Sequence, residues 1–268
     1  MKLGIITPRT EQGFKTAAEF ELDFVEYAFS DGREVEKTYP DTEEFLGNVP
    51  RIKGWIRSYG VGLQSVGRWG QQRWEGNGKL VEQELAKCLE MIDAASELEC
   101  PNFVVGCNEI EGLSFEENGR HAVEFFSRLV DYASPKGVRV SVYNCHWTNF
   151  VDQAGAWEAV LGEIPELGIK FDPSHSRYAG RDYLKEARDW GGRFGHVHLK
   201  GSLIIDGERF DDPPAGLDQT DWPSLLSVLY AHRYEGGLSI EPHSSVWNGE
   251  LGRKGIRFTV DYMRKLIL

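Results

Sequence analysis

The 268-residue chain lacks the excess of basic residues that broad binding to polyanions requires. Lys and Arg number 30 against 42 Asp and Glu, so the formal net charge at pH 7 is −12. Phosphate contacts dominate affinity for nucleic acids, and anionic membranes attract proteins by the same electrostatics. This composition therefore argues against a nucleic-acid or membrane-surface partner, and leaves room only for a local basic pocket.

The chain also lacks long apolar runs and paired cysteines. No stretch reaches the roughly 18 apolar residues that a membrane span needs. Residues 1–14 are too polar after Ile6 for the apolar core of a signal peptide. The cysteines show no CxxC spacing and are expected to be reduced and mostly buried; they are Cys88, Cys100, Cys107 and Cys145. We therefore expect a cytoplasmic protein.

What the sequence does contain is a regular alternation of β-rich runs and helix-like segments, with no low-complexity linker between them. Eight β-rich runs can be distinguished: 2–7, 22–29, 60–66, 102–107, 138–144, 168–172, 195–200 and 237–242. Between them, apolar residues recur three and four positions apart, which is typical of helices. Strands that alternate with helices imply parallel pairing, and eight such units in about 250 residues fit a closed (β/α)8 TIM barrel. We predict one domain, residues 1–268.

An open, doubly wound α/β sheet is the alternative to the barrel. Such sheets commonly carry a glycine-rich dinucleotide loop directly after the first strand. No such loop follows residues 2–7, and the glycine pair at 76–80 reads as a turn before a helix. The strand count and this absence favour the barrel.

Histidines and carboxylates gather at the ends of the last four predicted strands. Five of the seven histidines lie in "YNCHW", "FDPSH", "GHVHLK" and "IEPH". Catalytic residues of TIM barrels sit at the C-terminal ends of the strands, and carboxylates and imidazoles buried there are costly unless paired or metal-bound. We predict a divalent-metal site with Asp172, His198 and Glu241 as ligands. Mixed oxygen and nitrogen donors suit Mn²⁺, Mg²⁺, Co²⁺ or Zn²⁺ better than Ca²⁺.

The period of two along a strand gives neighbouring side chains different depths in the same site. His196, His198 and Lys200 share one face of the predicted strand. His196 then lies one pleat deeper and orients a neighbour, while Lys200 lies nearer the mouth and can hold a substrate oxygen. Simpler interpretations remain open: a strand histidine as a hydrogen-bonded core residue, Asp172 as a helix N-cap and Glu241 as a strand end.

The motifs "GIKFDPSH", "GHVHLKG" and "GLSIEPH", in this order, resemble those of the xylose isomerase-like TIM barrels. Within them the chain is most similar to the sugar phosphate isomerase/epimerase group, which includes inosose dehydratases and ketose 3-epimerases. The resemblance covers nearly the whole chain, although its specific motifs lie after about residue 138. It implies metal ligation by Asp172, His198 and Glu241, and substrate contact by His175.

The chain departs from this family pattern at two positions. The family usually places a Glu followed by Asn at the end of the fifth strand, as ligand and acid/base, where this chain has Tyr143 and Asn144. The fourth ligand would then be water, His146 or a carboxylate such as Glu109. Gly201 stands where relatives often carry an Asp.

These residues predict proton transfer at a carbon next to a carbonyl. A metal ion that polarises a hydroxy-ketone stabilises an enediolate, and Glu241 is the evident base, with His146 or His175 as partner acid. One base favours a proton shift, as in a sugar isomerase, or deprotonation with elimination. We expect a small-molecule sugar as partner. Its contacts are expected to come from His175, Lys200, Glu26, Arg68 and Trp69.

Three other functions fit parts of the pattern. A metal-dependent lyase or dehydratase of a keto-inositol or keto-glycoside would explain the missing fifth-strand Glu. A barrel that binds a sugar without converting it is a non-enzymatic alternative. A DNA-repair endonuclease is disfavoured by the acidic charge and by the absence of histidines before His121. Barrels of this type commonly pair, so a homo-oligomer is compatible with the sequence.

Overall fold

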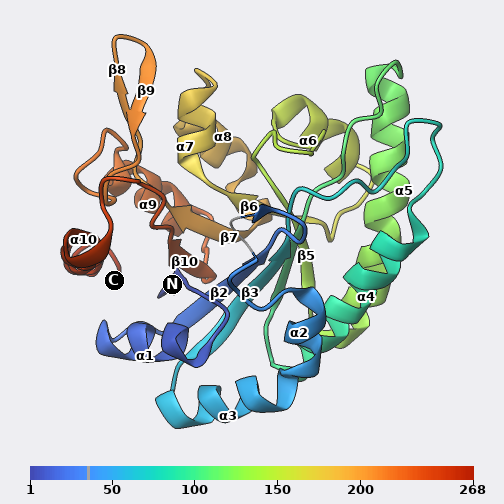
Figure 1. Cartoon of the computed structure of the whole chain (residues 1–268). Coiled ribbons are helices and arrows are strands. Elements are labelled where there is room, and N and C mark those ends of the chain that lie inside the picture. Colours follow the sequence, from blue (N-terminus) through green and yellow to red (C-terminus); the bar gives the residue numbers. More distant parts are fainter. Residues whose placement is uncertain (35–36) are drawn as a thin grey trace.

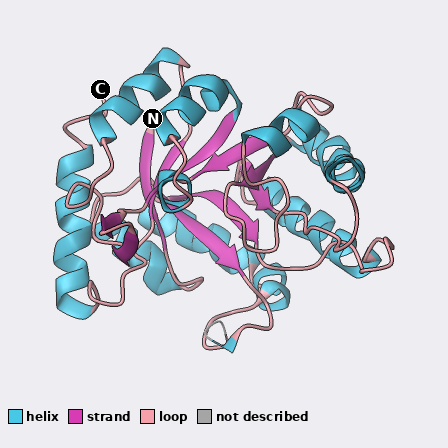
Figure 2. Ribbon diagram, turned by 90° about the horizontal axis from the view of Figure 1, so that it is seen from above, coloured by secondary structure: helices cyan, strands magenta, loops and turns pink. Residues whose placement is uncertain are grey.

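The chain folds into a closed barrel of eight parallel strands surrounded by helices. The structure, a computed structural model, describes residues 1–34 and 37–268. Around the barrel the strand order is β1-β10-β7-β6-β5-β4-β3-β2, so the first and last barrel strands are neighbours (Figure 1). The view from above shows strands around the centre and helices outside them (Figure 2). The predicted TIM barrel is confirmed, and the open sheet is excluded.

All eight β-rich runs of the sequence became barrel strands. Their bounds are β1 Lys2–Ile6, β2 Phe24–Phe29, β3 Gly62–Arg68, β4 Asn102–Val105, β5 Arg139–Tyr143, β6 Gly168–Phe171, β7 Phe194–Leu199 and β10 Gly237–Ile240. Two further strands, β8 Leu203–Ile205 and β9 Glu208–Asp211, pair antiparallel after β7. The sequence did not predict this hairpin, which projects from the barrel in Figure 1.

Ten described α-helices surround the barrel strands. They are α1 Glu11–Glu19, α2 Thr42–Gly47, α3 Val49–Tyr59, α4 Glu82–Glu97, α5 Phe115–Ala133, α6 Ala154–Leu161, α7 Pro173–Tyr178, α8 Tyr183–Trp190, α9 Trp222–Ala231 and α10 Gly249–Met263. Five of them, α2, α5, α7, α8 and α9, begin at a side-chain cap. Ser114 accepts from the N–H of Glu117, whose side chain accepts from Ser114 in return. Such capping boxes satisfy two free backbone donors. None of the described helices combines the length and the hydrophobicity of a bilayer-spanning segment.

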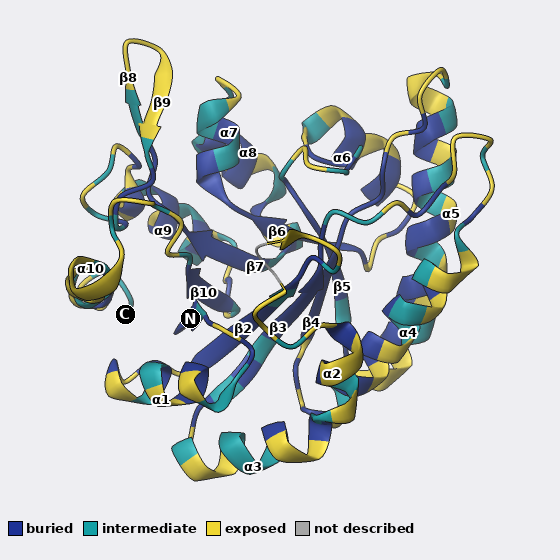
Figure 3. Cartoon of the chain, viewed as in Figure 1, coloured by how far each residue is buried: buried dark blue, intermediate teal, exposed yellow. Residues whose placement is uncertain are grey.

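The core lies between the barrel wall and the inner faces of the helices. Figure 3 shows barrel strands that are largely buried and helices with one exposed side, whereas the hairpin β8–β9 is largely exposed. The largest fully buried side chains include Trp157, Trp222, Phe14, Phe103 and Phe125. Burying one such side chain stabilises the fold by about 1.5–3 kcal/mol. This packing fixes the strand ends, so the polar side chains that they carry are held in place.

Candidate functional site

The innermost part of the site is a carboxylate that bridges two histidines across the barrel interior. Glu26 of β2 accepts from His196 Nε2 at 2.7 Å and contacts His198 Nε2 at 3.0 Å. All three side chains are buried. Glu26 was expected to contact substrate, but burial beneath the histidines makes it an orienting group instead. Its carboxylate fixes which way the His198 ring faces.

The three predicted metal ligands come together above this pair. Candidate ligand atoms of Asp172, His198 and Glu241 all lie within 4.8 Å of one another. His198 Nδ1, the ring nitrogen that Glu26 leaves free, lies 2.6 Å from Glu241 Oε2. Asp172 Oδ1 accepts from the N–H of Ser174 and caps α7. The N-cap interpretation of Asp172 therefore holds for one oxygen, while the other faces the cluster.

Two lysine ammonium groups share this cluster. Lys200 Nζ lies 2.9 Å from Asp172 Oδ2 and 3.7 Å from Glu241 Oε1. Lys170, on β6, places its Nζ 3.8 Å from the same Asp172 oxygen and 5.1 Å from the ring centre of Trp69. Lys170 was not predicted as a site residue. It lies two residues before Asp172 and therefore faces the same side of an otherwise apolar strand. Since a fully buried lysine is rare unless it is paired, this pattern could have identified it.

Charge and burial compete in setting the protonation states here. Burial alone would raise the pKa of Asp172, but Lys200 and His175 outweigh it and hold that pKa well below its usual range. Burial would lower the pKa of His198, yet Glu26 and Glu241 outweigh burial and raise it above the ordinary value of 6.5. Burial lowers the pKa of Lys170, and the carboxylates of Asp172 and Glu241 offset only part of that effect.

His175 lies beside Lys200 as a neutral ring. Burial, together with the positive charge of Lys200, lowers the pKa of His175 to about 3. Its Nε2 lies 3.2 Å from Lys200 Nζ, a distance at which the ammonium donates to the ring. The 3.3 Å contact between His175 Nε2 and Asp172 Oδ2 is then not an ion pair at neutral pH. The ring remains a quarter exposed, so it can also meet a ligand.

The donor set fits a divalent cation of the Mn²⁺, Mg²⁺, Co²⁺ or Zn²⁺ class. Two carboxylates and one carboxylate-oriented imidazole converge, which is a common ligand arrangement for these ions. Asp172 Oδ2 is buried and has no hydrogen bond of good geometry among the described residues, although Lys200 is close. An ion at this position would have to displace the ammonium of Lys200 from that oxygen.

The position of the family's fifth-strand Glu is filled by an aromatic side chain. Tyr143 stacks on Trp69 with ring centres 4.1 Å apart and donates from its hydroxyl to the carbonyl of Trp147 at 3.0 Å. Gly106 makes room for it, because a Cβ there would lie 2.3 Å from the tyrosine oxygen. Burial raises the pKa of Tyr143, so the phenol stays neutral. Tyr143 is thus a packing residue beside the cluster.

Asn144 ties the end of β5 to the end of β6. Its side chain donates to the carbonyl of Asp172 and accepts from the N–H of Asp172, both at 2.9 Å. This reciprocal pair fixes the backbone that carries a predicted ligand. His146 lies outside the cluster: its side chain is 82% exposed and meets Asp152 at 3.1 Å. Glu109 is also exposed, and neither belongs to the described groups that could hold an ion.

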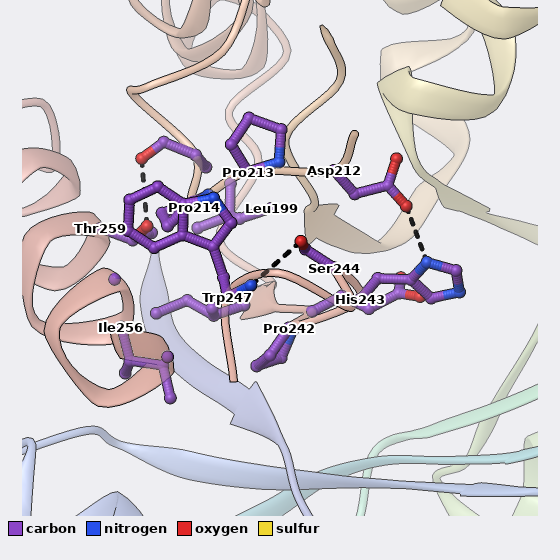
Figure 4. A pocket seen from close by; sticks show the side chains of 15 residues that line it. Leu199, Asp212, Pro213, Pro214, Pro242, His243, Ser244, Trp247, Ile256 and Thr259 are labelled. Carbon is purple, nitrogen blue, oxygen red and sulfur yellow. Dashed lines mark hydrogen bonds and ion pairs between the residues drawn. The ribbon is translucent and has the colours of Figure 1, made fainter. Parts of the chain in front are cut away.

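A pocket of about 580 Å³ opens above the cluster, within the range of small-molecule sites. Of the side chains expected to contact substrate, three line it: His175, Lys200 and Trp69. Trp147 and Tyr39 add aromatic faces. A smaller cavity of about 20 Å³, beside β10 and α10, has room for about one water. Figure 4 shows its lining, with Trp247 packed near Pro214 and His243 turned toward Asp212.

Arg68 does not face this pocket, contrary to the expectation that it contacts substrate. Its guanidinium donates to Glu84 at 2.7 and 2.9 Å and to Asp31 at 2.6 Å, and the side chain is almost fully buried. Arg73 contacts the same Glu84 carboxylate. The arginine thus joins β3 to α4 and to the chain after β2, as a structural ion-pair centre.

We expect Arg68→Lys to destabilise the fold by about 2 kcal/mol, because a lysine cannot reproduce the fork that serves two carboxylates. Urea unfolding followed by circular dichroism measures the change. Arg128→Lys, in an exposed helical pair with Glu124, is the matched control and should shift the free energy of unfolding by less than about 0.5 kcal/mol. Equal effects of the two substitutions would contradict the structural role of Arg68.

Comparisons with known proteins agree with this architecture. The family model described as "Xylose isomerase-like TIM barrel" matches residues 14–266. An L-ribulose 3-epimerase from Methylomonas sp. (strain DH-1) is 26% identical over 174 residues, covering 61% of this chain and 56% of the relative. An uncharacterized protein, YfiH, from Bacillus subtilis (strain 168) is 25% identical over 167 residues, covering 54% of this chain and 52% of the relative. The chain thus aligns with about half the length of these curated relatives.

Solved structures share the fold over the whole chain. A 3-keto-D-glucoside 4-epimerase from E. coli superposes with a TM-score of 0.74 at 17% identity, covering 99% of both chains. A D-allulose 3-epimerase from Methylomonas sp. gives 0.74 at 18% identity, covering 100% of this chain and 98% of the other. The IolI protein, solved with a zinc atom, gives 0.75 at 13% identity, covering 99% and 98%. The chain belongs to the xylose isomerase-like TIM barrel family.

Proposed function

We propose that the protein is a divalent-metal-dependent isomerase or epimerase of a sugar or keto-sugar, acting through an enediolate. The observation that carries this proposal is the convergence of Asp172, His198 and Glu241 below an aromatic-lined pocket. The relatives named as epimerases of ribulose, allulose and a keto-glucoside support the substrate class. The zinc atom in IolI supports the metal.

The roles of the residues follow from their positions. Asp172, His198 and Glu241 would hold the ion, which supplies polarisation of the substrate carbonyl and stabilisation of the negative charge that develops on its oxygens. Glu26 keeps the His198 ring in the orientation that this requires. Trp69 and Trp147 line the pocket and add apolar surface for the C–H groups of a sugar.

Glu241 is the base in this proposal. It is the one carboxylate among the described residues that line the pocket, and its Oε1 is turned toward Lys200 rather than His198. It removes the proton from the carbon next to the carbonyl. Lys200, which contacts both Asp172 and Glu241, and His175 beside it can return a proton to, or hold, a substrate oxygen. His146, the other expected partner acid, faces solvent.

A lyase or dehydratase reaction is the second candidate, and one observation favours it. Epimerisation by two bases needs a second acid/base on the opposite face of the substrate, and β5 offers there only the neutral, packed Tyr143. Deprotonation by Glu241 followed by loss of a β-hydroxyl, protonated from Lys200 or His175, needs no second carboxylate.

The test is proton exchange in D₂O with Mn²⁺, using a panel of ketoses, keto-glycosides and keto-inositols followed by NMR. Deuterium at one carbon with a new sugar supports the isomerase or epimerase, and formation of an enone or dicarbonyl product supports the dehydratase. If a sugar binds but no compound of the panel shows exchange or product, the result would support the non-catalytic barrel. The proposed function fails on that last outcome.

We expect Lys200→Met to raise the affinity for Mn²⁺ by about tenfold or more, because it removes the ammonium that lies 2.9 Å from Asp172. Isothermal titration calorimetry measures the affinity without any substrate. Lys254→Met removes an equal charge from an exposed helical pair and serves as the control. An unchanged or weaker affinity in Lys200→Met would show that the ammonium and the ion do not compete.

A further inference from the structure

The pocket above the cluster is cationic, although the chain as a whole is acidic. Four cationic side chains line it: Arg9, Arg33, Lys170 and Lys200. Glu241 is their sole acidic counterpart among the described lining residues, while the whole chain carries −12. A cleft lined by one sign of charge focuses the field and concentrates ligands of opposite sign. The charge of the pocket lining is therefore opposite in sign to the net charge of the chain.

The charges at the bottom of the site largely balance one another. Lys200 and Lys170 face Asp172 at 2.9 and 3.8 Å, and Lys200 also faces Glu241. His198 contacts Glu26 and Glu241. The two lysines at the floor thus already face carboxylates. The excess positive charge lies at the rim of the pocket rather than at its floor.

Arg33 is the rim cation available to a ligand. Its guanidinium lies 4.9 Å from the ring centre of Trp147, and both side chains line the pocket. No ion pair among the described residues involves Arg33. Arg9, by contrast, is already bound to the carbonyls of Pro40 and Ala28. The planar N–H fork of Arg33 therefore has donors free for an oxyanion.

The Trp147 ring that supports Arg33 is itself held in place. It lies against Gly70, where a Cβ would come 2.1 Å from the ring and where φ is +68°. Any other residue at position 70 would strain the backbone and push the ring away. The stacked pair of Arg33 and Trp147 is thus built by the fold at one wall of the pocket.

We propose that the substrate is an anionic sugar, whose carboxylate or phosphate binds Arg33 at the rim while its carbonyl end reaches Lys200 and Glu241. The sugar part of this inference rests on the proposed function, whereas the anionic part rests on the pocket charges alone. A neutral sugar forms no ion pair with the Arg33 guanidinium, which then stays hydrated and adds nothing to the affinity. An oxyanion gains charge-assisted, bidentate hydrogen bonds along the N–H edge of the guanidinium.

Calorimetry with matched ligand pairs tests the inference, with and without Mn²⁺. The phosphate arm compares D-fructose 6-phosphate with D-fructose, and the carboxylate arm compares D-tagaturonate with D-tagatose. We expect the acidic member of at least one pair to bind about tenfold or more tightly than its neutral partner, and the arm that shows the preference identifies the oxyanion. Arg33→Met should abolish the preference and leave the affinity for the neutral sugar within twofold. Arg57→Met, which removes an exposed charge outside the pocket lining, should preserve it.

Equal binding of acidic and neutral members, absence of binding in every arm, or a preference that survives in Arg33→Met would each overturn the inference. Arg33→Lys separates charge from fork geometry, because a lysine that restores the full preference would leave no role for bidentate binding. The D₂O exchange assay reports on the proposed function independently. An anion preference without any exchange would remove the catalytic proposal and keep the anion site.

Discussion

Glu241→Gln is expected to lower the rate of solvent proton exchange into the substrate by about 10²–10⁴-fold, the contribution typical of a positioned general base. The amide has nearly the same shape as the carboxylate but cannot accept a proton at neutral pH. Replacement also leaves the pocket with no carboxylate among its described lining residues. The measurement is the loss of the substrate C–H signal by NMR in D₂O with Mn²⁺ present.

Two controls separate a lost base from a damaged fold. Glu163→Gln makes the same change at an exposed position between α6 and β6. This variant should catalyse proton exchange into the substrate at the wild-type rate. The melting temperature of Glu241→Gln should stay close to wild type, because the Glu241 side chain is partly exposed. Exchange that is undiminished in Glu241→Gln would remove this residue from the role of base.

Glu26→Gln is expected to destabilise the fold by about 3–5 kcal/mol, because it removes the buried carboxylate that both His196 and His198 contact. The same substitution should weaken Mn²⁺ binding about 10–100-fold, since a metal-ligating histidine depends on the carboxylate that orients it. Urea unfolding and calorimetry give the two quantities. Glu19→Gln, in an exposed pair with Arg253, should change stability by less than about 1 kcal/mol.

The pH dependence of this effect has a definite sign. Burial alone would raise the pKa of Glu26, but His198 and His196 lower it well below the ordinary value of 4.5. A carboxyl with a lowered pKa contributes its stability in full above the unfolded-state pKa and loses it as pH falls toward the folded-state pKa. The difference between wild type and Glu26→Gln should therefore shrink below about pH 4.5. A difference that grows with acid would contradict the buried ion pair.

The barrel, and the alternation of side chains between the two faces of its strands, could be predicted because both depend on local periodicity. A run such as 194–199 alternates with period two, so the shared face of His196 and His198 follows from the chain alone. The hairpin β8–β9 escaped prediction because its strands are short and largely exposed. They carry no buried face whose pattern could reveal them.

The roles within the site were harder to predict because they depend on partners distant in sequence. Glu26 reads as a strand-end acid that could meet substrate, and only the fold shows that it lies beneath His198, 172 positions away. Arg68 reads equally well as a ligand-binding cation until Asp31 and Glu84 are placed around it. Lys170 looked like an ordinary strand residue, because its burial depends on neighbouring strands.

The pairing of β1 with β10 means that the sheet has free edges until the last strand docks. Before that event the backbone groups of β1 and β7 have no partners on one side, and afterwards the ring has no open edge. Glu241 directly follows β10, so the same docking event brings the pocket's acid against His198. The strand that closes the sheet therefore also completes the cluster of Asp172, His198 and Glu241.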